Sequence, residues 1–405
     1  MSRRRWAIVA LLFTASLINY LDRASLSLAL PQISRDLNLD PTTKGLLLSS
    51  FFWSYTFMQL PMGLLADRFP IRGFYAAMFT LWSFACGVTG FAGSLAMFVG
   101  LRVLLGVGEA IYYPGGTRTV SLLFAPDERG LPSGLFNSGT RAGLVVGGIV
   151  LPWLIVHFGW RNMFTILGFG SLLWLGPWLA IVPGGLRPEA RAGERLRWPT
   201  FHRNLLGICL GFFSFDYFLY LLLTWLPDYL VQVRHLSVTV AGAYSAIPFL
   251  LFTAGEATGG WFGDLLIRRG WSETRARKTI VSAASLLGLL LIPAVRMENV
   301  NIAIALIACA CAAGLAMGNL IAMVQACARP GEIAAWAGLQ NFGGNCGGIV
   351  APLITGILIT RTGSYMPGFV IAAVVLALGL LPYWFIVGEL RPPAQAEAGV
   401  LADAG

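Results

Sequence analysis

The chain has 405 residues, of which 57% are hydrophobic and only 12% are charged, and its mean hydropathy is +0.72. Soluble domains carry about 25% charged residues, so this composition excludes an ordinary soluble protein and predicts one whose solvent is lipid. The formal net charge of +9 comes from Lys and Arg residues gathered in loops on one predicted side of a membrane, and it gives no reason to expect nucleic acid as a partner.

Runs of about 20 apolar residues recur along the whole chain, and each is long enough to cross a hydrocarbon core of about 30 Å. We predict twelve membrane-spanning helices. They cover residues 6–30, 45–66, 74–92, 95–120, 132–157, 162–182, 204–233, 238–262, 279–295, 301–327, 334–359 and 368–387. Because the connections are short, we expect an all-α integral membrane protein without a separate soluble domain.

Lys and Arg are distributed unevenly between the two sides of these helices. With the N-terminus inside, the cytoplasmic segments hold 19 of the 28, the opposite side holds six, and three lie within spans. Positive charge favours the cytoplasmic side, so both termini are predicted there. The first helix follows arginines, as a signal peptide does. We expect it to be retained, since its run is long and contains no small-residue cleavage pattern.

Two of the predicted helices carry charges in the middle of an apolar run. The first contains Asp22 and Arg23, and the fourth contains Arg102 and Glu109. Each such charge costs about 2.5 to 3.5 kcal/mol on insertion scales, so these side chains must face protein or water. Arg102 and Glu109 are seven residues apart, hence on one helical face and about 10 Å apart. These four charges form either structural ion pairs or a polar pathway. We favour the pathway because a buried ion pair often adds little net stability to a fold.

The second half of the chain repeats motifs of the first. Residues 134–143 (GLFNSGTRAG) match residues 338–347 (GLQNFGGNCG) at a constant offset of 204. Weaker matches pair Leu-Pro at 30–31 with 226–227, and Gly-x-x-x-Asp at 63–67 with 260–264. We therefore predict two six-helix bundles related by a pseudo-two-fold axis, with a substrate site between them near the midplane. The bundles span 1–183 and 203–390, joined by a cytoplasmic linker at 184–202 and followed by a cytoplasmic tail at 391–405.

The fifth predicted helix has two faces of different character. Its glycines at 139, 143 and 147 form a stripe suited to close packing, and Asn137 and Arg141 lie about 160° away on a face that cannot meet lipid. With the repeat, this predicts a cavity lined by Asn137, Thr140, Arg141, Asn341 and Asn345. The alternative is that the polar residues satisfy one another between helices. Arg141 would contact a second carboxylate of the substrate or pair with Asp216.

Further charges lie outside this cavity. Asp216 and Glu256, in mostly apolar segments of the second half, are candidate functional acids, the second as a conformational lock. A charge network at the cytoplasmic ends of the second and eighth helices is expected to hold the outward-open state. It would consist of Asp67, Arg68, Arg72 and Arg118, with Asp264, Arg268 and Arg269 as the second-half counterpart. The alternative is that these are topogenic charges and ordinary turn residues.

The side chains that usually carry enzymatic or metal chemistry are not grouped in the sequence. The six cysteines all fall within spans, without C-x-x-C spacing or a nearby histidine cluster, and we expect them to be packing residues. His157, His202 and His235 lie in or beside loops. We therefore expect no enzyme activity, no metal and no cofactor.

Several motifs in register resemble those of a known transporter family. Residues 63–72 (GLLADRFPIR) and Arg102-x-x-x-Gly106-x-Gly108-Glu109 resemble signatures of the major facilitator superfamily. Residues 19–23 (NYLDR), 49–55 (SSFFWSY), 224–230 (TWLPDYL) and 343–348 (GGNCGG) are similar to the anion:cation symporter family within it. The resemblance covers about residues 15 to 365. Pro70 replaces a glycine common in the first signature, and Arg141 replaces an expected neutral residue.

The resemblance implies a proton-coupled importer of organic anions, often sugar acids, in the bacterial inner membrane. It implies proton-coupling carboxylates at Asp22 and Glu109. It also implies anion-contacting arginines at Arg23 and Arg102 and substrate-contacting tyrosines at Tyr20 and Tyr55. The expected partners are a small organic anion and the lipid bilayer, and we expect a monomer. The coupling ion is expected to be H⁺, with Na⁺ left open.

The charges themselves also favour an anion. The formal charge of the predicted cavity is +1 when Asp22 and Glu109 are ionised, and it is +3 when both acids are protonated. The positive charges come from Arg23, Arg102 and Arg141. The leading hypothesis is therefore proton-coupled symport, by alternating access, of a sugar acid such as a hexonate, hexuronate or hexarate. An importer or exchanger of another carboxylate, aromatic or dicarboxylic, is the second hypothesis. A non-transporting membrane sensor is the third, although the Ala-rich end offers no signalling tail.

Overall fold

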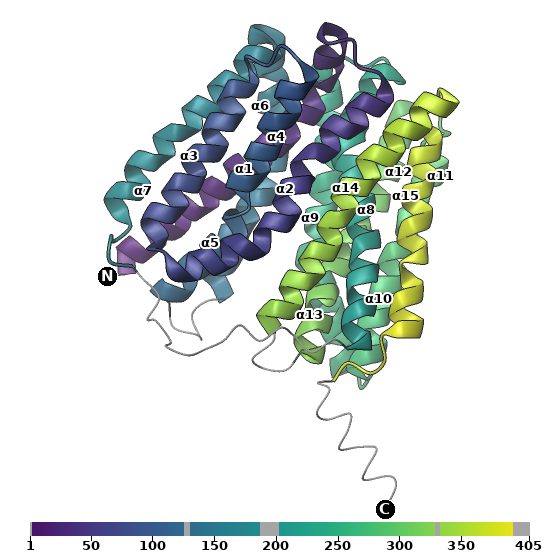
Figure 1. The fold of residues 1–405 in the computed structure, drawn as a ribbon. Helices are drawn as coiled ribbons and strands as arrows, with labels where there is room; N and C mark the ends of the chain where they lie inside the picture. Colours follow the sequence, from purple (N-terminus) through teal and green to yellow (C-terminus); the bar gives the residue numbers. More distant parts are fainter. Residues whose placement is uncertain (1, 125–129, 187–201, 329–332, 392–405) are drawn as a thin grey trace, which may run out of the picture. The chain divides into compact units, whose positions relative to one another are not determined.

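The computed structural model describes residues 2–124, 130–186, 202–328 and 333–391, and every regular element within those ranges is helical (Figure 1). The α-helices are α1 (Ser2–Asp36), α2 (Pro41–Arg68), α3 (Ile71–Thr89), α4 (Leu95–Glu109), α5 (Tyr112–Leu123), α6 (Gly130–Ser171), α7 (Leu175–Ile181), α8 (Arg203–Gln232), α9 (Val238–Arg268), α10 (Glu273–Leu287), α11 (Leu291–Ala294), α12 (Val300–Ala310), α13 (Met317–Cys327), α14 (Ile333–Thr362) and α15 (Met366–Leu378). Short 3-10 turns at Leu172–Trp174, Gly288–Leu290 and Cys311–Ala316 join neighbouring helices, and a π turn follows at Pro382–Ile386.

Ten stretches in the described ranges are long and apolar enough to cross a membrane. Each predicted span falls on helical structure. The fifth and sixth belong to one run, Pro132–Ile181, which Gly159 interrupts with a φ of 76° that favours glycine. The second predicted span lies in α2, which is not one of the ten stretches. The all-α membrane fold is confirmed, and the count of twelve spans stays a prediction.

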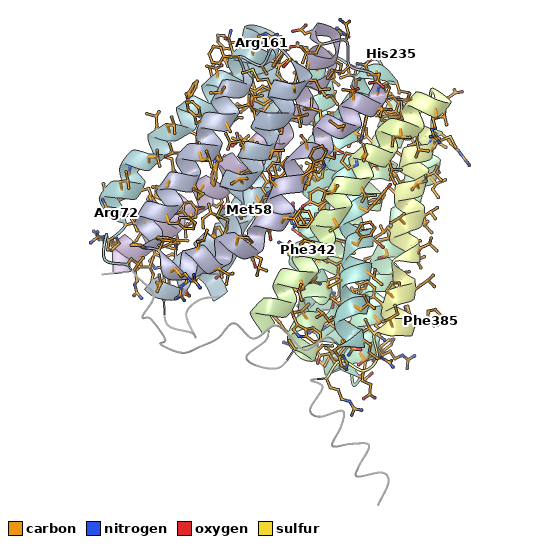
Figure 2. All side chains as sticks on the ribbon, viewed as in Figure 1. Met58, Arg72, Arg161, His235, Phe342 and Phe385 are labelled. Carbon is orange, nitrogen blue, oxygen red and sulfur yellow. The ribbon has the colours of Figure 1, made fainter. Side chains whose placement is uncertain are left out.

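The outer surface carries the apolar side chains that a bilayer requires. Leu173 is 82% exposed and Phe385 is 77% exposed, and Figure 2 shows Phe385 on the outer face of the helices. In water such side chains would favour aggregation, whereas lipid is as apolar as they are.

Polar side chains in the connections set where several helices begin. Asp40 caps α2, because its carboxylate accepts a hydrogen bond from the Thr43 backbone N–H at 3.1 Å, and Pro41 occupies the first helical position. The Thr43 hydroxyl also donates to this carboxylate, and these bonds hold the pKa of Asp40 below its usual value. Ser94 caps α4 and Ser272 caps α10 in the same manner.

The two copies of the sequence repeat have the same local packing. Gly139 and Gly143 of α6 lie directly against the backbone of Phe13 and Leu17 in α1, so a Cβ at either glycine would clash. In the second copy, Gly343 and Gly347 of α14 pack in the same way against α8. The hairpin turns that follow also correspond, because Gly159 and Gly363 differ by the repeat offset of 204 and both have positive φ.

The helices form two compact units. The first comprises Met1–Glu194, Leu223–Ala246 and Pro352–Arg361, and the second comprises Arg195–Leu222, Ile247–Ala351 and Thr362–Gly405. The first unit therefore includes parts of α8, α9 and α14, which follow the predicted linker at 184–202. The predicted division into two bundles was drawn from the sequence repeat, whereas these two units are defined by which residues lie close together in space.

A buried ion pair helps to hold those later segments in the first unit. Lys44 Nζ, in the first turn of α2, lies 3.3 Å from Asp228 Oδ2 of α8, and the two side chains are 9% and 0% exposed. One residue further along α2, Gly45 packs against the backbone of Pro352 and Gly356 in α14. Because both side chains of the ion pair are buried, the attraction between their charges is stronger than it would be in water.

We predict that Lys44→Ala lowers the free energy of unfolding by about 3–5 kcal/mol, because it leaves the Asp228 carboxylate buried without its cation. The double variant Lys44→Met/Asp228→Leu is expected to recover most of that loss. Thermal unfolding of the purified protein in detergent measures both effects. Arg35→Ala, which changes an exposed cation at the end of α1, serves as the control and should be nearly neutral. Equal effects of Lys44→Ala and Arg35→Ala would contradict the prediction.

Candidate functional site

The four charges predicted from the first and fourth spans come together inside the first compact unit. Asp22 and Glu109 are fully buried, and Arg23 and Arg102 are 8% and 2% exposed. Arg23 Nε lies 3.2 Å from Glu109 Oε2, so the ion pair joins α1 to α4. The ion pair is thus formed between two helices rather than within one helix.

Glycines in α4 make this approach possible. A Cβ at Gly106 would clash with the backbone of Phe51 in α2, and one at Gly108 would clash with Trp82 in α3. The Ser54 hydroxyl of α2 donates to the Val103 carbonyl of α4 at 2.6 Å. The glycines of the Arg102-x-x-x-Gly106-x-Gly108-Glu109 motif therefore bring Glu109 within reach of α1.

Aromatic rings surround the Arg23 guanidinium. Its Cζ lies 4.9 Å from the ring centroid of Tyr20, 4.9 Å from that of Phe51 and 4.3 Å from that of Tyr55. Ring faces attract a desolvated cation, so they stabilise the charge within the membrane. Tyr20 and Tyr55 were predicted in this site, whereas Phe51 was not. The signal was present in the sequence, since Phe51 is one helical turn before Tyr55.

Asp22 has a different neighbour. Its Oδ1 lies 3.2 Å from the Sγ of Cys86 in α3, a buried thiol that sequence analysis assigned only to packing. Asp22 also interacts electrostatically with Arg102 and Arg23, and Glu109 interacts with the same two arginines. The two acids and two arginines therefore form one electrostatic cluster.

Several buried polar atoms of this cluster and of Asn19, which precedes it in α1, have no hydrogen-bond partner among the described residues. They are both side-chain amide atoms of Asn19, Asp22 Oδ2, Glu109 Oε1, and Arg102 Nε and Nη2. Leaving a buried polar atom unsatisfied costs about 1–3 kcal/mol, so a fold that retains several of them together points to a site for a ligand or a proton. Arg102 stands out, because a buried guanidinium is poised to donate to a carboxylate.

Arg23 and Arg102 line a common pocket. Its other lining residues are Leu26, Ser27, Leu48, Phe51, Phe52, Leu223 and Thr224. The two guanidinium groups provide positive charge on one part of the wall, and Ser27 and Thr224 provide hydroxyl groups. This combination suits an anion that also carries hydroxyls, since arginine binds carboxylates through paired hydrogen bonds.

The predicted cavity residues of α6 differ in how far their side chains are exposed. Asn137 is exposed, Arg141 is partly buried, and Thr140 is 4% exposed. The Thr140 hydroxyl donates to the Asn137 carbonyl at 2.7 Å, and the Tyr112 hydroxyl of α5 donates to Asn137 Oδ1 at 3.3 Å. Tyr112 was not predicted. The assignment of Asn137, Thr140 and Arg141 to a substrate cavity stays a prediction.

The remaining predicted polar residues belong to the second unit. The Tyr220 hydroxyl donates to Asn345 Oδ1 at 2.9 Å, and the Asn345 amide donates to the Asn341 carbonyl at 2.8 Å. Asp216 is 6% exposed and packs against Gly344, where a side chain would not fit, and Glu256 is partly buried. Asn341 and Asn345 thus belong to one polar cluster with Tyr220, and their role in substrate binding stays a prediction.

The charged residues near the predicted cytoplasmic ends are divided between the two units. Arg72 donates from Nη2 to the Leu179 carbonyl, and its own carbonyl accepts from Trp178 Nε1 at 3.0 Å, so these bonds join α3 to α7. Arg68 is exposed and Arg118 is partly buried. The side chain of Asp67 lies outside the described residues, so the first-half network stays a prediction.

In the second unit, Asp264 pairs with a residue that sequence analysis did not single out. Arg277 Nη2 of α10 lies 2.8 Å from Asp264 Oδ1, and Arg277 also bonds to Glu273 and, at 3.2 Å, to Asn319 Oδ1. The prediction that Asp264 pairs with Arg268 and Arg269 is therefore wrong, and both of those side chains are exposed. Arg277 lies in the first turns of the next helix, where the hairpin turn after α9 brings it back to Asp264.

A helical membrane fold with an internal repeat and a buried arginine–carboxylate cluster is typical of secondary transporters. Residues 12–342 match the Major Facilitator Superfamily, and the chain belongs to this superfamily. The resemblance seen in its motifs is therefore confirmed, and the protein is a multi-pass membrane transporter rather than an enzyme.

Curated relatives align over nearly the whole chain. A Bacillus subtilis protein named probable galactarate/D-glucarate transporter GudP is 32% identical, covering 96% of this chain and 92% of its own. An Escherichia coli O6:H1 D-galactonate transporter is 31% identical, covering 96% and 97%. The Bacillus subtilis hexuronate transporter is 28% identical, covering 99% and 98%.

Solved structures show the same fold. A bacterial homolog of the human lysosomal transporter Spinster, inward-facing and unoccupied, aligns with a TM-score of 0.79 at 18% identity, over 96% of this chain and 98% of that one. A D-xylose-proton symporter aligns with a TM-score of 0.76 at 14% identity, over 95% and 98%.

We predict that replacing each arginine by methionine affects stability to a different extent. Arg23→Met leaves Glu109 buried without the cation that contacts it and should destabilise the protein by about 3–5 kcal/mol. Arg102→Met removes a guanidinium with two unsatisfied nitrogens but also an attraction for Asp22 and Glu109, so its net effect should be smaller than that of Arg23→Met. Denaturation curves of the two variants in the same detergent test this. If Arg102→Met proves as unstable as Arg23→Met, Arg102 has a structural role rather than a ligand-binding one.

Proposed function

We propose that the protein is a proton-coupled symporter that imports a sugar acid across the bacterial inner membrane by alternating access. The observation that carries the proposal is the buried cluster of Asp22, Arg23, Arg102 and Glu109, in which one arginine is paired and the other retains unsatisfied donors. The excess of Lys and Arg in the predicted cytoplasmic segments supports an orientation with both termini inside, and we propose that the working unit is a monomer.

The ion pair provides a physical route for coupling. While Glu109 is ionised, its carboxylate holds Arg23 at 3.2 Å and competes with any substrate carboxylate for that guanidinium. A proton that reaches Glu109 removes the competing charge and leaves Arg23 available. An anion bound between Arg23 and Arg102 then replaces the lost negative charge. Proton and anion therefore favour each other's binding, which is the thermodynamic requirement for symport.

The substrate class follows from the pocket and the relatives together. Two arginines favour a carboxylate, and the hydroxyls of Ser27 and Thr224 favour a polyhydroxylated chain. Relatives that align over nearly the full length are named for galactarate or D-glucarate, D-galactonate and hexuronate. We propose a hexonate, hexuronate or hexarate, with Arg141 deciding between one and two carboxylates.

A thermal-shift screen tests the substrate class directly. The purified protein is heated with a panel of sugar acids, neutral sugars, aromatic acids and simple dicarboxylates. A ligand at about 100 times its Kd stabilises the folded protein by about 2.7 kcal/mol, so a cognate sugar acid should raise the unfolding temperature visibly. Stabilisation by aromatic acids or simple dicarboxylates and not by sugar acids would favour the alternative carboxylate importer.

We predict that Asp22→Asn and Glu109→Gln each lower proton-driven accumulation of the stabilising anion in proteoliposomes at least tenfold. Both variants keep the shape of the side chain and remove the proton site. Exchange of internal for external anion should continue, since it does not require a change in protonation. Glu298→Gln, at an exposed acid before α12, is the control. Accumulation against a gradient in both single variants would show that these acids do not couple transport to protons.

A further inference from the structure

A buried thiol lies against one of the two acids. Cys86 is 1% exposed, and its Sγ lies 3.2 Å from Asp22 Oδ1. The other carboxylate oxygen, Oδ2, is buried and has no hydrogen-bond partner among the described residues. The thiol is therefore in direct contact with a carboxylate whose second oxygen remains available for a proton.

The thiol distinguishes the two protonation states of Asp22. An S–H group is a weak donor, and an ionised carboxylate is the better acceptor for it. A protonated carboxyl would instead need an acceptor, and sulfur is a weak one. The charged groups that face Asp22 are Arg23 on its own helix and Arg102 and Glu109 on α4. The arginines also favour the ionised form and Glu109 opposes it, while Cys86 is the neutral contact among them.

We propose that Cys86 is a positioning residue, whose thiol holds the Asp22 carboxylate and promotes release of the transported proton. The inference rests on the proposed proton-coupled function. In the inward-facing carrier, the proton passes from the Asp22 carboxyl to water, and the thiol hydrogen bond then forms with the carboxylate. No bond to sulfur forms or breaks, and Cys86 undergoes no redox change.

This role predicts which part of the transport cycle depends on the thiol. Net import requires Asp22 to lose its proton before the empty carrier returns. Exchange of one anion for another does not, because the carrier then crosses loaded in both directions. Loss of the thiol should therefore slow net import and leave exchange unchanged, whereas a packing defect would slow both.

The test compares Cys86→Ala and Cys86→Val, which lack a donor, with Cys86→Ser, which keeps one. In proteoliposomes, Cys86→Ala and Cys86→Val should lower the rate of net uptake several-fold. Their rates of anion exchange should stay within about twofold of that of the unmodified protein. They should also move the midpoint of the pH profile of net uptake upward by about half to one unit, the size expected for loss of a weak hydrogen bond to a charge. Cys86→Ser should stay close to the unmodified protein. Cys311→Ala, at a buried cysteine of the second unit, is the control.

Infrared titration separates failure of this inference from failure of the proposed function. In a Glu109→Gln background, the protonated-carboxyl band that Asp22→Asn abolishes should disappear at a higher pH in Cys86→Ala than in its parent. If the parent shows no titrating band from Asp22, the proposed coupling role of Asp22 is wrong. If that band titrates identically with and without the thiol, or if Cys86→Ser behaves like Cys86→Ala in transport, Cys86 is only a packing residue.

Discussion

The ion pair between Arg23 and Glu109 is the constraint on which the first unit depends. A charge of either sign inside a bilayer must be compensated, and here each compensates the other across two helices at 3.2 Å. In the same helix as Glu109, Gly106 and Gly108 let α4 lie closely against α2 and α3, where a Cβ at either position would clash. The aromatic rings of Tyr20, Phe51 and Tyr55 lie beside the guanidinium and stabilise its charge.

The two copies of the repeat share their packing but differ in their chemistry. In each, glycines of one helix lie against the backbone of another, so the helix-on-helix geometry is the same. At the position equivalent to Asn345, the first copy carries Arg141. In the second, Asn345 and Tyr220 form a neutral hydrogen bond at 2.9 Å. Packing depends on a few backbone contacts, which leaves the polar faces able to diverge.

Much of the fold could be predicted because lipid imposes strict rules on composition. Apolar length located the helices, and the cost of burying charge singled out Asp22, Arg23, Arg102 and Glu109 as side chains that must face protein or water rather than lipid. The pairing among them could not be predicted, since helical periodicity relates residues within one helix only. For the same reason Arg277, rather than Arg268 or Arg269, was missed as the partner of Asp264. Cys86 was missed because a thiol in an apolar run gives no signal until its neighbour is known.

The sequence distance between the paired charges has a consequence for how the protein is made. Arg23 and Glu109 are separated by 86 positions. At about 5–20 residues per second, the ribosome needs roughly 4–17 s to synthesise the intervening segment. During that interval Phe51 and Tyr55 of α2 are already made and can contact the Arg23 guanidinium, whereas the Glu109 carboxylate is not. The cluster is therefore completed in an order set by the chain, with the aromatic contacts before the ion pair.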